Sequence, residues 1–297
     1  MGTFYLDKIR EYVFQRSRLS FAGHKKGVLR QRLENRIGEL GLPDLAAYWD
    51  YLLRTAEEER RLFDILTTNE TFFFRDPLQF RYLRETILPA LEQARGMELL
   101  RAWGEGAAPT MKLRILCAGC ASGEEPYSVA MTILETLRYP RAWDVEIVAG
   151  DLSESCLEAA IEGHYGEDRL KGVPADFIDR YMTRSGKGAV MGEEVKRLVR
   201  FVHLNLNDVM TGGEIPGAEE GSAGFDVIFC RNVMIYFSPP CQQLLVDTLY
   251  RLLAPGGHLF TGDAEPLHLF RHSFVAVRES GCLVYRKTEI QDDVKAL

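Results

Sequence analysis

The sequence predicts an α/β protein with a mostly parallel, doubly wound sheet, preceded by a small helical domain. From about residue 111 onward, short apolar runs alternate with stretches whose apolar residues recur at helical spacing. This alternation is typical of a parallel sheet covered by helices on both faces. The last two runs have little sequence between them and are expected to form an antiparallel hairpin at the sheet edge. We expect strands near 113–117, 145–150, 199–204, 225–230, 257–262, 273–278 and 282–286, and helices near 125–138, 153–161 and 239–253.

Composition shifts divide the chain into three parts. Residues 1–80 are helical in pattern, 81–110 hold a helix and a Gly/Ala/Pro-rich linker at 104–109, and 111–297 carry the sheet. The span 163–198 interrupts the strand–helix alternation with charged and glycine-bearing sequence. We therefore expect a small inserted β-subdomain there.

Two helices of the N-terminal part can be placed from their apolar spacing and their ends. The first carries an apolar stripe and ends before Pro43. The second follows Asp44, a favoured N-cap residue. The residues expected to face inward are Leu29, Leu33, Ile37 and Leu40 in the first helix and Leu45, Tyr48, Leu52 and Leu53 in the second.

Charge is unevenly distributed along the chain. The formal net charge is −7, yet residues 1–40 hold nine Lys or Arg against four acids, a local net of +5. Lys25, Arg32 and Arg36 are spaced seven and four apart and so share one helix face. This face is either a solvated helix surface or a binding surface for an acidic partner. On the second alternative these three residues bind the substrate, and no nucleic-acid partner is expected.

No segment of the sequence points to a membrane or to a metal. No run approaches 18 apolar residues, and residues 1–20 lack the apolar core of a signal peptide. The only close cysteine pair, Cys117 and Cys120, has no second pair to complete a zinc site. We therefore expect a cytoplasmic protein, without membrane insertion or metal, in which these cysteines are small buried residues.

A small-residue turn after the first sheet strand is the centre of the predicted site. In the turn 119–123 the glycines and the alanine carry no more than a methyl group, so the backbone can pass close under a ligand. Ser122 and Glu125 match a capping box at the start of the following helix. Glu124 has no such role and is therefore the better candidate to face the ligand.

Asp151 provides a second anchor at the tip of the next strand. An acid there accepts hydrogen bonds from ribose hydroxyls, although Asp is also a favoured cap for a helix beginning near Ser153. The turn lacks a G-x-G-x-x-G pattern, and two glutamates stand where a pyrophosphate would need backbone N–H groups without negative charge. An acid-lined turn suits a cationic ligand. The sequence therefore favours S-adenosylmethionine, with its sulfonium and ammonium groups, and methyl transfer over hydride transfer.

Two further segments bring polar residues to the same edge. The buried strand and turn at 225–237 deliver Arg231, Asn232 and Tyr236 to the carboxyl end of the sheet. The loop 66–77 contains three consecutive phenylalanines followed by Arg75, whose planar fork suits a carboxylate. The phenylalanines either form an aromatic wall beside the ligand or plug the core between two domains.

Four blocks together resemble the chemotaxis-receptor protein-glutamate O-methyltransferase (CheR-type) family. They are Leu66–Asn69 through Arg75, Ala121–Ser128, Asp151, and Phe229–Phe237, and the likeness spans roughly residues 20–287. The resemblance implies a helical domain and a class I S-adenosylmethionine-dependent methyltransferase domain, Rossmann-like, with a small inserted antiparallel β-subdomain. With Gly119 of the turn added, the cofactor site it implies is lined by Asn69, Thr71, Arg75, Gly119, Glu124, Asp151, Asn205, Leu206, Arg231 and Asn232.

The resemblance also implies the reaction, which is methylation of glutamate carboxylates on chemoreceptors for sensory adaptation. A glutamate with an ordinary pKa of about 4.3 is already ionised at neutral pH, so orientation rather than a general base is the protein's main contribution. Arg75 is assigned to holding the carboxylate, and Tyr236 to a hydrogen bond that fixes its angle. The expected partner is the cytoplasmic helical domain of a chemoreceptor, and the enzyme is expected to act as a monomer.

Two departures from the family pattern and two alternatives accompany this prediction. Phe72 fills a slot that is commonly small or variable, and the region 184–192 is shorter than in members that dock on a receptor tail. One alternative is a class I methyltransferase acting on a small molecule or nucleic acid, which the acidic body and the helical domain disfavour. The other is a non-enzymatic sensing module, which the intact Arg75, Asp151 and Tyr236 disfavour.

Overall fold

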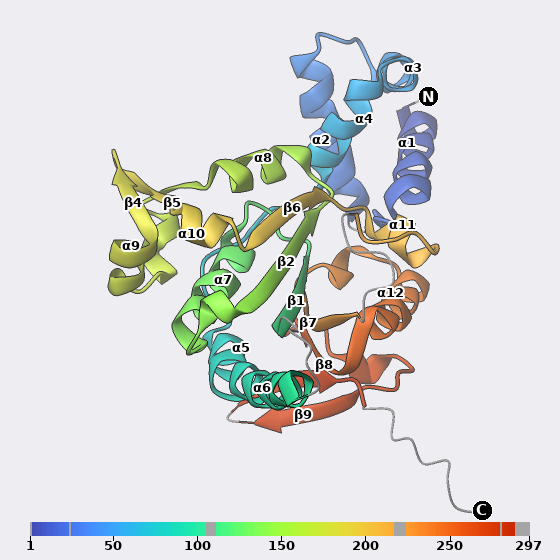
Figure 1. Ribbon diagram of the computed structural model, residues 1–297. Helices are drawn as coiled ribbons and strands as arrows, with labels where there is room; N and C mark the ends of the chain where they lie inside the picture. The colour runs from blue at the N-terminus through green and yellow to red at the C-terminus, as the bar shows by residue number, and fades with distance from the viewer. Residues whose placement is uncertain (1, 24, 105–110, 217–223, 280, 289–297) are drawn as a thin grey trace, which may run out of the picture.

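The computed structural model describes residues 2–23, 25–104, 111–216, 224–279 and 281–288. A bundle of N-terminal helices sits at one end of a larger domain built on a twisted sheet (Figure 1). The predicted linker at 104–109 falls almost wholly outside the described residues. Among the described residues, no helix has both the length and the apolar composition needed to cross a membrane.

The central sheet has seven strands in the order β6-β2-β1-β7-β8-β10-β9. The pairs from β6 to β8 are parallel, while β10 runs antiparallel between β8 and β9. This confirms the predicted parallel sheet with an antiparallel hairpin at one edge. The strands are β1 (Met111–Ala118), β2 (Trp143–Asp151), β6 (Val199–His203), β7 (Phe225–Cys230), β8 (Leu253–Thr261), β9 (Val275–Glu279) and β10 (Cys282–Arg286).

Helices bury both faces of this sheet. In β1, Leu113 and Ile115 pack into the core on one face, together with residues of α5 and α7, whereas Leu116 and Ala118 pack on the other face with α11 and α12. Strands buried on both faces are mostly apolar, which made them visible in the sequence. The helices of this domain are α5 (Pro77–Tyr82), the π-helical η1 (Leu83–Ile87), α6 (Leu88–Gly104), α7 (Glu124–Thr136), α8 (Glu154–Glu162), α11 (Leu206–Met210) and α12 (Pro239–Leu252), with 3₁₀ turns η2 (Pro140–Ala142), η4 (Met234–Tyr236) and η5 (Leu267–Leu269).

Four helices form the N-terminal domain: α1 (Gly2–Ser17), α2 (Lys25–Glu39), α3 (Leu45–Arg54) and α4 (Ala56–Leu66). Their common core contains the predicted apolar residues of α2 and α3, with one exception. Leu53 is 56% exposed, so the prediction that it faces inward is wrong. The buried stripe of α3 runs through Leu45, Tyr48 and Leu52 at helical spacing and leaves Leu53 beside it. Asp44 caps α3 as predicted, accepting from the N–H groups of Ala46 and Ala47 at 2.9 Å each.

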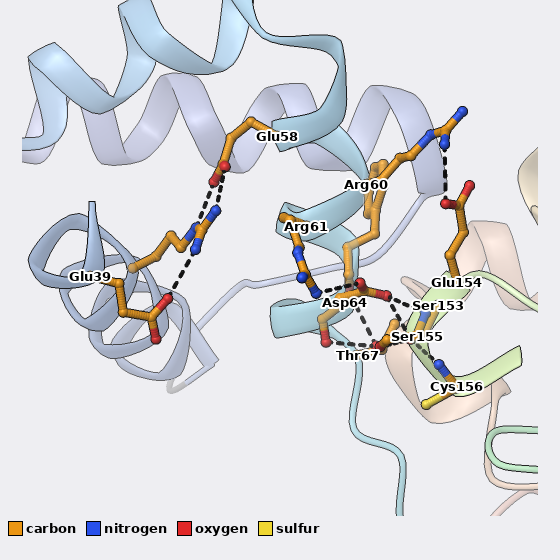
Figure 2. A network of polar contacts seen from close by, with 12 residues as sticks. Glu39, Glu58, Arg60, Arg61, Asp64, Thr67, Ser153, Glu154, Ser155 and Cys156 are labelled. Carbon is orange, nitrogen blue, oxygen red and sulfur yellow. Dashed lines mark hydrogen bonds and ion pairs between the residues drawn. The ribbon is translucent and has the colours of Figure 1, made fainter. Parts of the chain in front are cut away.

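The two domains are joined by polar contacts between α4 and the start of α8 (Figure 2). Asp64 Oδ1 of α4 accepts a hydrogen bond from the hydroxyl of Ser153 at 2.7 Å. Arg60 of α4 pairs with Glu154 at 3.3 Å. Because Ser153 is the N-cap of α8, the helical domain contacts the turn that directly follows β2.

The inserted segment forms a separate three-stranded antiparallel sheet in the order β3-β5-β4. It lies to one side of the main sheet, beside α8 (Figure 1), and confirms the predicted β-subdomain. Its elements are β3 (His164–Gly166), η3 (Arg169–Gly172), α9 (Ala175–Tyr181), β4 (Met182–Ser185), β5 (Gly188–Met191) and α10 (Glu193–Lys196).

Candidate active site

A cavity of about 310 Å³ lies between the carboxyl ends of the parallel strands and the helical domain. Its lining includes residues that follow β1, β2, β6 and β7, where open α/β sheets bind their ligands. Two of the predicted site residues, Glu124 and Arg36, are not part of the lining. The predicted residues that the cavity brings together are Lys25, Arg32, Asn69, Thr71, Arg75, Gly119, Asp151, Asn205, Leu206, Arg231, Asn232 and Tyr236.

The glycines of the turn 119–123 are required by the surrounding protein as much as by a ligand. Gly119 has φ +82°, and a Cβ there would lie 2.4 Å from Cγ2 of Val233. Gly123 has φ +92°, and a Cβ there would lie 2.8 Å from Cβ of Ala160. Both glycines are therefore fixed by backbone conformation and close packing. The sequence argument, which considered only the approach of a ligand, did not include this reason.

The two glutamates after the turn do not lie as predicted. The helix α7 begins at Glu124 and has no side-chain cap, so the capping box of Ser122 and Glu125 does not form. Glu124 is fully buried behind the turn, where it forms an ion pair with Arg169. Glu125 instead lines the cavity and accepts from Nε of Arg231 at 2.6 Å. Glu125 therefore occupies the position beside the cavity that was predicted for Glu124.

Asp151 ends β2 with its carboxylate held by backbone amides. Oδ2 accepts from the N–H of Ala121 at 2.8 Å, and Oδ1 accepts from the N–H of Ser153 at 2.9 Å. The N-cap of α8 is Ser153, so the alternative that Asp151 caps this helix is wrong. Burial raises the pKa of Asp151, while these backbone donors act in the opposite direction. Each carboxylate oxygen has a further lone pair and can accept from a ribose hydroxyl.

Arg231 follows β7, and its buried side chain forms hydrogen bonds to the loop that precedes α5. In addition to Glu125, it donates from Nη1 to the carbonyl of Arg75 at 2.6 Å and to Asp76 Oδ2 at 3.1 Å. These nitrogens already have protein acceptors. Arg231 therefore shapes the cavity wall and holds Arg75 in place.

Asn232 lines the cavity and carries a buried side-chain acceptor without a partner among the described residues. Its backbone has φ +59°, in the left-handed region that Asn tolerates better than most residues. Its Oδ1 is buried and accepts no hydrogen bond from the residues that the structure describes. A buried acceptor without a donor costs about 1–3 kcal/mol, so this atom is suited to a donor group on a ligand.

Glu265 is a site residue that the sequence analysis did not identify. Its carboxylate accepts from the N–H groups of Asn232 at 2.6 Å, Gly262 at 2.9 Å and Ile235 at 3.2 Å. It thereby fixes the loop that carries both Asn232 and Tyr236. Glu265 follows strand β8, and an acid after a sheet strand was also the signal that identified Asp151.

The three phenylalanines of the loop 66–77 do not form a wall of the cavity. Phe73 is 1% exposed and packs edge-on against Tyr165. Phe74 packs edge-on against Phe80, and Phe72 is 47% exposed. The core-plug alternative is therefore right for Phe73 and Phe74, and the aromatic wall is wrong. The polar residues of the loop line the cavity instead.

Cationic side chains line the side of the cavity nearest to the helical domain. The Arg75 guanidinium lies 5.5 Å from the ring centroid of Phe72 and donates to the carbonyl of Glu70 at 3.2 Å. Lys25 donates to the carbonyl of Ile235 at 2.8 Å, and Arg32 donates to backbone carbonyls of the α4 end and the following loop. Within the described chain, Lys25, Arg32 and Arg75 form no ion pair with a carboxylate.

Arg36 does not belong to this group. Its Nε and Nη2 donate to the two carboxylate oxygens of Glu58 at 3.0 and 2.7 Å, and its Nη1 donates to Glu39 at 3.0 Å. Figure 2 shows the two glutamates converging on this guanidinium. Glu58 is 2% exposed and also accepts from the hydroxyl of Tyr48. The geometry therefore gives Arg36 a structural role in place of the predicted substrate contact.

Tyr236 lies where the two domains meet at the cavity. Its ring is 5.7 Å from Nζ of Lys25, and its carbonyl accepts from the N–H of Ser20 at 2.8 Å. Leu19 forms a β-bridge with Phe237 beside it. The segment between α1 and α2 thus lines the site, although no sequence motif marks it. The Tyr236 hydroxyl has no hydrogen-bond partner among the described residues.

The cysteines at the end of β1 behave as predicted. Cys117 and Cys120 are both buried and form no disulfide. Burial raises the pKa of each thiol well above its ordinary value, so both remain protonated at neutral pH. They fill space under the turn.

Comparison with known proteins identifies the family. The family description "CheR methyltransferase, all-alpha domain" matches residues 5–67, and "CheR methyltransferase, SAM binding domain" matches residues 69–280. The chain belongs to the CheR methyltransferase family. It is therefore an S-adenosylmethionine-dependent methyltransferase.

Relatives of known name support this assignment. A chemotaxis protein methyltransferase 2 of Pseudomonas aeruginosa is 34% identical over 94% of this chain and 91% of its own length. The chemotaxis protein methyltransferase of Escherichia coli K12 is 34% identical, over 87% of this chain and 82% of its own. The probable biofilm formation methyltransferase WspC of Pseudomonas aeruginosa is 33% identical over 95% of this chain, which spans only 62% of that longer protein.

The cavity of this CheR methyltransferase fits S-adenosylmethionine. Asp151 offers acceptors for ribose hydroxyls, and the unpartnered Oδ1 of Asn232 offers one for an ammonium or amide donor. Glu125 and Asp151 supply negative charge near a cationic ligand. When bound, S-adenosylmethionine supplies an electrophilic methyl group on a positively charged sulfur.

Proposed function

We propose that this methyltransferase esterifies glutamate side chains on the cytoplasmic helical domain of chemoreceptors. The observation that carries the proposal is the set of three cations, Lys25, Arg32 and Arg75, on one side of the cavity without carboxylate partners. Cations without a counter-charge in a partly enclosed site favour an anionic acceptor. An acceptor bearing a carboxylate satisfies this requirement, whereas a neutral amine or hydroxyl does not.

The proposed reaction needs no proton transfer. One carboxylate oxygen forms a bond to the methyl carbon as the bond from that carbon to sulfur breaks with its electron pair. The products are a neutral ester and a neutral thioether. Arg75 holds the second carboxylate oxygen, and the free hydroxyl of Tyr236 donates to the same group and fixes its angle. Such orientation is worth roughly 7 kcal/mol or more in well-aligned reactions.

Receptor recognition is proposed to use the first turns of α2. Lys25 and Arg32 line the cavity, and both are half-buried, so their charges stay available to a large partner. The methylated stretch of a receptor is an acidic helix under this proposal, which complements the +5 net charge of residues 1–40. Since that stretch lies in the cytoplasm, so does the enzyme. Relatives named for chemotaxis and for biofilm formation are consistent with a sensory receptor as the partner.

The test is transfer of radiolabelled methyl from S-adenosylmethionine to a purified cytoplasmic receptor fragment. We expect label that is released as methanol in base, since carboxyl methyl esters hydrolyse while N-methyl groups do not. Replacing the acceptor glutamates with alanine should abolish it. Base-stable label would contradict the proposal, as would undiminished labelling of the glutamate-free fragment. S-adenosylmethionine binding without transfer to any of several receptor fragments would favour the sensing-module alternative.

A further inference from the structure

The inserted β-subdomain contacts the cofactor turn through one buried charge. Glu124, the first residue of α7, is 0% exposed. Its ion-pair partner is Arg169 of η3, whose side chain is 36% exposed at the inner side of the subdomain. Burying a carboxylate is costly unless a cation compensates it. No other ion pair is shown for Glu124 in the described residues.

Ser122 connects this ion pair to the turn. Its hydroxyl accepts from Nη2 of Arg169 at 2.6 Å and donates to Oε2 of Glu124 at 3.0 Å. Its carbonyl accepts from the hydroxyl of Tyr165 of β3 at 2.7 Å. The subdomain therefore contacts both the side chain and the backbone of a residue in the turn.

The opposite side of the turn is held by the main sheet. The N–H groups of Gly119 and Cys120 donate to the carbonyl of Gly150 at 2.8 and 3.0 Å, and the N–H of Ala121 donates to Asp151. The turn thus lies between two supports of different origin. The sheet support is backbone hydrogen bonding, while the subdomain support depends on the charge of Arg169.

We propose that Arg169 is a positioning residue for the cofactor turn, and that it couples the inserted β-subdomain to the affinity for S-adenosylmethionine. Arg169 does not line the cavity. It acts by compensating Glu124, so that the first turn of α7 keeps Glu125 and the backbone of Ala121 at the cavity wall. The proposal rests on the cofactor of the family and not on the identity of the methyl acceptor.

The balance of charge between Glu124 and Arg169 predicts that the affinity of an Arg169 variant for S-adenosylmethionine depends on pH. Burial raises the pKa of Glu124, and Arg169 opposes this rise. The other titratable groups that face Glu124 are Tyr165 of β3 and Cys156 of α8, both neutral in the physiological range because burial raises their pKa values. Without Arg169, the pKa of Glu124 rises further. Lowering the pH then protonates Glu124 and removes the uncompensated charge.

The experiment measures S-adenosylmethionine binding to the full chain by calorimetry between pH 6 and pH 8. Arg169→Met should raise the Kd about tenfold at pH 8, within the range of typical intramolecular couplings, and the difference from wild type should shrink toward pH 6. The double variant Arg169→Met/Glu124→Gln should bind with a Kd within about threefold of wild type at every pH, because no buried charge remains. Arg180→Met is the matched control, since Arg180 is also a subdomain arginine paired with α7, through Glu135, and lies away from the turn.

Three outcomes would overturn the proposal. The first is an unchanged Kd in a folded Arg169→Met variant. The second is a loss of affinity that is equal at all pH values and persists in the double variant. The third is an equal loss in Arg180→Met, which would indicate general loosening of the subdomain. If Arg169→Met does not fold, the double variant decides: near-normal, pH-independent binding supports the proposal, and lost binding overturns it.

Discussion

The two sides of the cavity are built in different ways. On the sheet side, Asp151 and Asn232 line the cavity and are fixed by hydrogen bonds from backbone amides or to Glu265. On the helical-domain side, Lys25, Arg32 and Arg75 donate hydrogen bonds to backbone carbonyls or a side-chain hydroxyl and are half-buried. The first side is rigid and accepts hydrogen bonds. The second is cationic and more accessible.

This difference is consistent with the two tasks that we propose for the site. A small cofactor is best bound by desolvated, preorganised groups, because little reorganisation is then needed on binding. A carboxylate that arrives on a large helical partner needs charges that remain accessible until docking. The contrast predicts that substitutions on the sheet side weaken cofactor binding, and that substitutions on the other side impair the use of the acceptor.

The largest effect is expected at Asp151. Asp151→Asn puts an amide N–H₂ against one of the two backbone N–H groups that the carboxylate accepts. It also replaces the charged carboxylate, which we propose accepts from the ribose hydroxyls, with a neutral amide. We expect the Kd for S-adenosylmethionine to rise about 100-fold, the equivalent of one to two charged hydrogen bonds. Calorimetry checks this, with Asp144→Asn at the exposed start of the same strand as the control.

A smaller, acceptor-specific effect is expected at α2. Charge reversal in Lys25→Glu/Arg32→Glu should raise the KM for the receptor fragment about tenfold, with the Kd for S-adenosylmethionine nearly unchanged, because charges at the rim of a site act mainly on association. The increase should diminish at high salt. Arg30→Glu reverses a single charge on the same helix, outside the cavity lining, and should have little effect. A KM that is equally affected by Arg30→Glu would remove the specific role of the pair.

Arg36 should have the smallest effect on catalysis. Arg36→Met removes the cation that compensates the buried Glu58 and should lower the free energy of unfolding by about 3 kcal/mol. The KM of the folded fraction should change less than about twofold, since Arg36 lies outside the cavity. Thermal or denaturant unfolding measures the free energy of unfolding, and steady-state kinetics measures the KM. A large KM increase in a variant of normal stability would restore Arg36 to the substrate-binding group.

The sheet and most of the site could be predicted because their signals are local. The strand Phe225–Cys230 is buried along its whole length and is apolar except for Asp226, and the residues that follow it must reach the carboxyl edge. Parallel strands carry their carboxyl ends to one side, so Asp151, Arg231 and Asn232 could be expected together before any contact was known.

The positions of Glu124 and Arg36 depend on partners that are distant in sequence. Glu124 and Glu125 are neighbours of one type, and the one buried behind the turn is chosen by Arg169, 45 residues further on. Arg36 shares a helix face with Arg32, yet Glu58 from another helix pairs with it. Spacing within one element predicts which side chains share a face. It does not show which neighbouring element will neutralise them.

The most direct test of the two-sided site is the variant Arg75→Ala, assayed for cofactor binding and for turnover on the same preparation. Arg75 has backbone and ring contacts only, and the account assigns it to the acceptor carboxylate. We predict a kcat lowered about 100-fold, as for a misplaced reacting group, with a Kd for S-adenosylmethionine within about threefold of wild type. Equal losses in kcat and in cofactor affinity would place Arg75 on the cofactor and contradict the separation of the two sides.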